Sequence, residues 1–81
     1  MITKLFALKD TKLCYLSPFV QANEAVAVRS VCGAMREPDK NVFNTDIEDK
    51  ELWLLGTYDD ETGIIKPDLK FVIGLKDLKE L

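Results

Sequence analysis

The stretch LWLLGTYDDETGIIKP, residues 52–67, constrains the fold of this chain more than any other. It contains a dense apolar run, a cluster of three acids closed by Gly63, a second apolar pair and then Pro67. Two apolar runs joined by a short polar segment with a glycine are typical of a β-hairpin. Gly63 fits the left-handed position that closes a type I turn with a G1 bulge. We therefore predict two antiparallel strands joined by an acidic turn.

Both faces of this hairpin are apolar. Leu52 and Leu54 have one parity along the first strand, and Trp53 and Leu55 have the other. A sheet with one solvated face alternates apolar and polar residues, so a strand that is apolar on both sides needs a cover on each side. A single helix covers one side only. The second side needs a second copy of the chain, the C-terminal tail or stacked nucleic-acid bases, and of these we favour the second copy.

The rest of the chain predicts one helix and further strands. Residues 1–8 and 13–20 are rich in β-compatible side chains, and Pro18 places the end of the second segment at a sheet edge or a bulge. The helix is expected to begin after Asn23, a good N-cap, and to end before Pro38. In the loop that follows, the side chains expected to reach the core are Val42, Phe43 and Ile47.

The predicted order is therefore ββαββ, an α+β fold with a small antiparallel sheet and one helix on one face. Residues 1–67 are expected to form this single domain. Residues 68–81 are expected to be a tail element that packs on the sheet or on a partner subunit. Within the tail, LKFVI is typical of a strand, and the leucines of LKDLKEL have near-helical spacing.

The composition excludes several classes of protein. No apolar run approaches the roughly 20 residues that span a membrane. The 81 residues contain no histidine and only two cysteines, so neither the usual proton shuttle nor a zinc ligand set is present. We expect a protein that stays in the cytoplasm, is not an enzyme, and holds neither a cofactor nor a metal. Cys14 and Cys32 are expected to be buried thiols.

The charges are divided unevenly along the chain, although the net charge is −3. Residues 1–40 contain six cations and four acids, and residues 41–81 contain five cations and ten acids. A mildly basic N-terminal half allows a local phosphate-binding surface. Single-stranded nucleic acid needs aromatic faces flanked by cations. The candidate contacts to nucleic acid are Lys4, Lys9, Lys12, Tyr15, Arg29 and Arg36. The candidate dimer or partner interface contains Trp53, Leu55, Phe71 and Ile73.

Three segments resemble the small nonstructural protein of gokushoviruses, which are microviruses, small icosahedral single-stranded-DNA phages. SPFV (17–20) is similar to a PFF-like segment of that family, and EAVAVRSV (24–31) is similar to an EAxRxF-like helix. EDKELWLLGTYDDETG (48–63) resembles EDYxLxxLGxFDDxTG, and LGTYDDETG is the most specific piece. The family's tail is often Pro-rich, whereas this tail is apolar, so no tail function is carried over.

The resemblance implies a non-capsid phage protein of the host bacterial cytoplasm. It implies binding of single-stranded DNA, or modulation of phage genome replication, and our reading of the sheet adds that the protein acts as a homodimer. The alternative is a dimeric adaptor that contacts the phage replication initiator or a host factor without binding DNA. Phosphate contacts would make DNA affinity fall steeply with salt, whereas an adaptor would show no DNA affinity.

Overall fold

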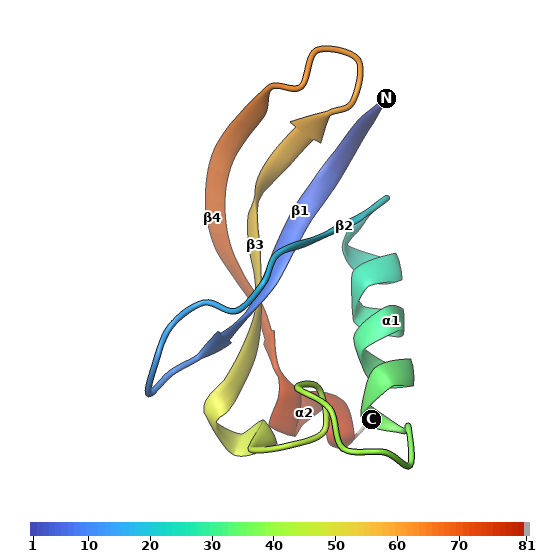
Figure 1. Cartoon of the computed structure of the whole chain (residues 1–81), viewed down its shortest axis with the longest axis vertical. Helices are drawn as coiled ribbons and strands as arrows, with labels where there is room; N and C mark the ends of the chain where they lie inside the picture. Colours follow the sequence, from blue (N-terminus) through green and yellow to red (C-terminus); the bar gives the residue numbers. More distant parts are fainter. Residues whose placement is uncertain (81) are drawn as a thin grey trace.

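The computed structural model describes residues 1–80, and its four strands form one antiparallel sheet in the order β2-β1-β3-β4 (Figure 1). The predicted α+β class is confirmed. The elements in chain order are β1 (Ile2–Asp10), β2 (Phe19–Gln21), α1 (Glu24–Met35), the 3-10 turn η1 (Ile47–Asp49), β3 (Lys50–Asp59), β4 (Ile65–Gly74) and α2 (Leu75–Lys79).

The predicted hairpin is formed by β3 and β4. Gly63 has a φ of 75°, and its amide donates to the carbonyl of Asp59 at 2.7 Å, so the left-handed closing position is confirmed. The returning strand does not end at Pro67. It continues to Gly74 and pairs with β3 along most of its length. Pro67 is tolerated there because β4 is an edge strand, where a missing N–H need not break a ladder.

Both helices cover the same face of the sheet. α1 begins where the sequence predicts, because the side chain of Asn23 accepts the amide of Val26 at 3.0 Å and caps the first turn. α1 and α2 bury apolar side chains against β1 and β3. The resulting core consists of Phe6, Leu8, Ala27, Val31, Leu52, Leu54, Leu75 and Leu78. Within residues 1–80, no helix has the length and apolar character needed to cross a membrane.

The second strand is much shorter than predicted. β2 contains only residues 19–21, and residues 11–18 form a wide turn in which Tyr15 makes an isolated bridge with Lys9. The amide of Leu16 donates back to the carbonyl of Leu8 at 2.8 Å. Because this segment leaves the ladder, Cys14 is exposed, and the prediction that it is buried is wrong. Cys32, on α1, is half-buried and packs against the core.

Side chains that bond to backbone carbonyls hold the segment between α1 and β3. The amide nitrogen of Asn41 donates to the carbonyl of Ala34 at the end of α1, at 3.2 Å. The ammonium of Lys50 is buried and donates to the carbonyl of Val42 at 2.7 Å. The Lys50 ammonium gives the loop carbonyl of Val42 a donor, and the Asn41 side chain adds a second donor to a helix-end carbonyl that also accepts the amide of Glu37.

Two of the three predicted core side chains in this loop are confirmed. Phe43 and Ile47 are half-buried and pack against the core. Val42 remains 49% exposed, so its prediction is wrong. The reason is that the carbonyl of Val42, and not its side chain, is held against the domain by the buried Lys50.

Candidate functional site

The face of the sheet that carries no helix is largely apolar. Phe6 and Phe19 stack on the helix side, with their ring centroids 6.1 Å apart. Their neighbours Leu5 and Val20 pair with each other across β1 and β2 and therefore point to the opposite side.

The same alternation holds along β4. The ammonium of Lys70 lies 3.8 Å from the carboxylate of Glu24 on α1, so Lys70 points to the helix side. Its neighbours Leu69 and Phe71 point away from α1. We name this surface the open face. It consists of Leu5, Lys9, Tyr15, Val20, Glu51, Trp53, Leu69 and Phe71, and Ala7 points to the same side but is fully buried.

The described part of the C-terminal tail leaves the open face uncovered. Leu75 and Leu78 of α2 lie in the core on the helix side, so the tail packs on the sheet but not on its second face. The open face therefore keeps large apolar side chains in contact with water: Val20 is 45% exposed, Leu69 59% and Phe71 47%. Of the three covers considered from the sequence, a second copy and stacked bases remain.

One end of the open face carries a group of rings around a lysine, which we name the cation–aromatic corner: Lys9, Tyr15, Trp53 and Phe71. The Trp53 ring lies 5.7 Å from Phe71 and 6.1 Å from Tyr15, edge-to-face in both cases. The ammonium of Lys9 lies 5.0 Å from the centre of the Trp53 ring and 5.3 Å from that of Tyr15. Both distances fall within the range of cation–π attraction. The indole N–H of Trp53 donates to Glu51 at 3.0 Å.

The corner offers ring surfaces and a cation side by side. That combination suits an unpaired nucleotide, which presents a flat base and a negative phosphate. A second cation is available in the adjoining turn, where the ammonium of Lys12 lies 3.5 Å from the carboxylate of Asp49. Lys12 is largely exposed and an exposed ion pair contributes little, so Lys12 can exchange Asp49 for a phosphate at small cost.

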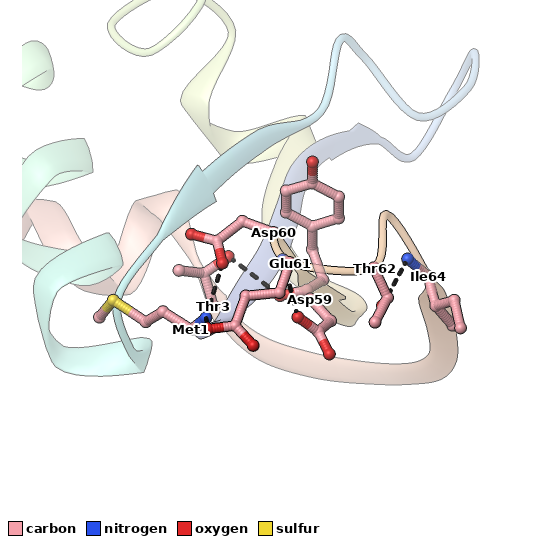
Figure 2. A network of polar contacts seen from close by, with 8 residues as sticks. Met1, Thr3, Asp59, Asp60, Glu61, Thr62 and Ile64 are labelled. Atoms are coloured by element: carbon pink, nitrogen blue, oxygen red, sulfur yellow. Dashed lines mark hydrogen bonds and ion pairs between the residues drawn. The ribbon is translucent and has the colours of Figure 1, made fainter.

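The acids of the hairpin turn shape that turn at the far end of β3 (Figure 2). The carboxylate of Asp59 accepts the amide of Glu61 at 2.9 Å, and this bond lowers the pKa of Asp59. The amino group of Met1 donates to Asp60 at 2.6 Å, and this bond raises the pKa of the amino group. Among residues 1–80, no group of three or more His, Cys, Asp or Glu side chains is placed to hold a metal ion.

A family model described as Phage ORF5 protein matches residues 3–78. The chain belongs to this family. No curated protein and no solved structure matches the chain. The prediction of a phage protein, made from the resemblance of residues 13–67, is thereby confirmed.

In this Phage ORF5 family protein, the predicted nucleic-acid contacts do not share one surface. Lys9 and Tyr15 meet in the corner. Arg29 and Arg36 are exposed on α1. Lys4 pairs with Gln21 in β2, whose side chain bonds to α1, so Lys4 points to the helix side. A nucleic-acid strand that contacted all of these cations would have to wrap around the edge of the sheet.

The predicted partner residues divide in the same way. Trp53 and Phe71 lie on the open face. Leu55 is half-buried at a register shift, where it has no paired residue in either neighbouring strand. Ile73 packs against the core and not on the open face. The reason is a second register shift, between Leu52 and Trp53, which inserts an extra residue into β4 and reverses the side on which Ile73 lies.

Sequence reasoning missed four members of the open face: Leu5, Val20, Glu51 and Leu69. A signal for Leu69 was present, because the β4 stretch KPDLKF alternates charged and apolar residues with the period of a strand. Val20 could not be assigned to a face without knowing that β2 is only three residues long and pairs with Leu5.

Proposed function

We propose that this Phage ORF5 family protein is a non-capsid gokushovirus protein that binds single-stranded DNA during genome replication in the host bacterial cytoplasm. Family membership supports the phage origin. The resemblance of residues 13–67 to the gokushovirus nonstructural protein supports the group of phages. One observation supports the ligand: the ammonium of Lys9 lies beside the rings of both Tyr15 and Trp53 on an uncovered sheet face.

Binding would exchange one set of contacts at the corner for another. An unpaired base stacks on Trp53 or Tyr15, an interaction worth about 1–3 kcal/mol per base. The base takes the place of the Lys9 ammonium over the ring, and Lys9 turns to the phosphate, where a charge-assisted contact replaces the cation–π attraction. Every base has a ring face, so this binding is tolerant of sequence. The role is one of binding, without catalysis and without a cofactor.

Fluorescence titration tests this function directly, because Trp53 is the single tryptophan of the chain and lies in the corner itself. A single-stranded oligonucleotide should change the fluorescence of Trp53 more strongly than the matched duplex does. The logarithm of the affinity should fall with the logarithm of the salt concentration, with a slope of about −0.7 for each phosphate neutralised. Contacts from Lys9 and Lys12 together predict a slope near −1.4 on that basis. Equal responses to both forms of DNA, or no response at low salt, would contradict the proposal.

A second candidate function is a dimeric adaptor that contacts the phage replication initiator or a host factor. The observation that favours it is the scarcity of charge on the open face, where Lys9 and Glu51 are the two charged residues among the eight that define it. An adaptor would show no salt-dependent affinity for DNA. Its binding would depend on the apolar side chains and not on Lys9 or Lys12.

A further inference from the structure

We propose that two copies of this chain pack together through the apolar part of the open face, which consists of Leu5, Val20, Leu69 and Phe71 with Trp53 at its margin. This interface goes beyond the proposed DNA binding and does not depend on it. Its basis is that the described part of the tail lies on the other side of the sheet, and that large apolar side chains stay exposed on β2 and β4, with half-buried Leu5 and Trp53 between them on β1 and β3.

The size of the face fits a small dimer interface. Strands lie about 4.8 Å apart and rise about 3.3 Å per residue, so some seven residues of β1, β3 and β4 together with the three residues of β2 give a footprint of roughly 400 Å². That area is smaller than the roughly 600 Å² per partner at the lower end of stable interfaces. An apolar patch of this size lies within the range of the largest patches on monomers and is often functional. We therefore expect a reversible dimer.

Contact through the face is favoured over contact along the β4 edge. An exposed edge strand can pair with the same strand of another copy unless charges or a proline prevent it. β4 carries Lys66, Asp68 and Lys70 on the helix side and Pro67 near its start. Charged residues and a proline prevent an edge strand from pairing with a strand of another chain. β4 is therefore unsuited to pairing along its edge, whereas its apolar side remains free for contact.

The charge distribution favours a second copy over a polyanion as the cover of this part of the face. The one cation of the open face, Lys9, lies at the end where β1 pairs with Glu51 of β3. Leu69 lies near Leu55, four residues from Glu51 and therefore about 13 Å along the strand. The centre of the patch thus holds no charge to contact a phosphate, and burying it leaves no charge unpaired. A two-fold axis needs only one self-complementary apolar surface on each copy.

The dimer also leaves the proposed DNA contacts accessible at its margin. Lys9 and Lys12 lie at the end of the sheet beyond Trp53, in β1 and in the turn that follows it. The two proposals therefore predict different mutational effects. Substitution of Lys9 should weaken DNA binding and leave the dimer, whereas substitution of Leu69 should weaken the dimer.

Sedimentation velocity over a wide concentration range tests the dimer, with two neighbouring residues as a matched pair. Leu69→Lys places a cation on the open face, and Asp68→Lys places the same side chain one residue away on the opposite side. Both positions are exposed, so both variants should keep the wild-type circular dichroism and melting temperature. Because each substitution occurs twice in a symmetric dimer, Leu69→Lys should weaken self-association about 100-fold. Asp68→Lys should change it less than about threefold.

Three outcomes would overturn this proposal. The first is a wild-type chain that is monomeric at every concentration. The second is an equal effect of Leu69→Lys and Asp68→Lys on self-association. The third is a monomer that forms a complex with a single-stranded oligonucleotide, with Leu69→Lys but not Asp68→Lys abolishing the complex. That last result would support DNA binding while assigning the apolar patch to stacked bases.

Discussion

Gly56 of β3 and Lys66 of β4 approach so closely that a Cβ atom on Gly56 would overlap with the carbonyl oxygen and carbon of Lys66. The register of the sheet shifts at this point, because Leu54 pairs with Lys70 whereas Gly56 pairs with Pro67. Between these two pairs, one residue of β3 therefore opposes two of β4, which is the pattern of a β-bulge and bends the hairpin locally. A glycine is required by the close approach of the two backbones and not by its own φ angle.

Replacing Gly56 with alanine should therefore destabilise the protein by about 2–4 kcal/mol, because the backbone atoms of β4 cannot move without breaking the ladder. Gly33→Ala is the matched control. Gly33 lies within α1, nothing is within 4 Å of the position of its Cβ, and alanine should stabilise the helix by about 0.5–1 kcal/mol. Urea unfolding monitored by Trp53 fluorescence measures both. Similar small effects of the two substitutions would show that β4 does not pass close to Gly56.

The buried ammonium of Lys50 provides a second test of the fold. Lys50→Met keeps the apolar stem but leaves the carbonyl of Val42 without its donor, which should cost about 1–3 kcal/mol. Lys40→Met makes the same chemical change at an exposed position and should change stability by less than about 0.5 kcal/mol. Chemical denaturation gives the difference. Equal stability of the two variants would mean that the Lys50 ammonium does not hold this loop.

The sequence contained the local signals of the fold but not the long-range ones. Gly63 and Asn23 could be interpreted correctly because a turn glycine and an N-cap act within a few residues. α2 could not be assigned in this way. A helix of five residues has no stability of its own, and α2 forms because Leu75 and Leu78 are buried against the sheet and α1.

Some residues of the candidate site could likewise be placed from local patterns, and others depend on long-range packing. That Trp53 lies opposite to Leu52 and Leu54 follows from the two-residue period of a strand, so its place outside the core could be predicted. Ile73 could not be placed, because one inserted residue in β4 exchanges the two faces, and no sequence pattern marks that insertion. The contact of Lys9 with Tyr15 depends on how residues 11–18 leave the ladder, which tertiary packing decides.

The turn acid Asp59 predicts a pH dependence. The amide of Glu61 bonds to its carboxylate and holds the folded-state pKa below the unfolded value of about 3.9. A carboxylate with a depressed pKa contributes stability above the unfolded value, and this contribution is lost as the pH falls through the folded value. Carbon-detected NMR titration should show Asp59 titrating below the unfolded value. The stability of Asp59→Asn should fall less than that of the wild type between pH 5 and the folded pKa. Titration of Asp59 at or above the unfolded value would contradict the turn geometry.

The cation–aromatic corner predicts separate effects of charge and of ring stacking on DNA binding. Lys9→Gln removes one phosphate contact, so it should reduce the magnitude of the salt slope for single-stranded DNA by about 0.7. Tyr15→Ala should weaken binding by about 1–3 kcal/mol at every salt concentration and leave the slope unchanged, because stacking releases no counterion. Lys66→Gln is the matched control for Lys9→Gln, since it removes the same charge from the exposed outer part of β4. Fluorescence anisotropy of a labelled oligonucleotide at several salt concentrations measures all three variants. A change of slope for Lys66→Gln equal to that for Lys9→Gln would show that DNA responds to the net charge of the chain and not to the corner.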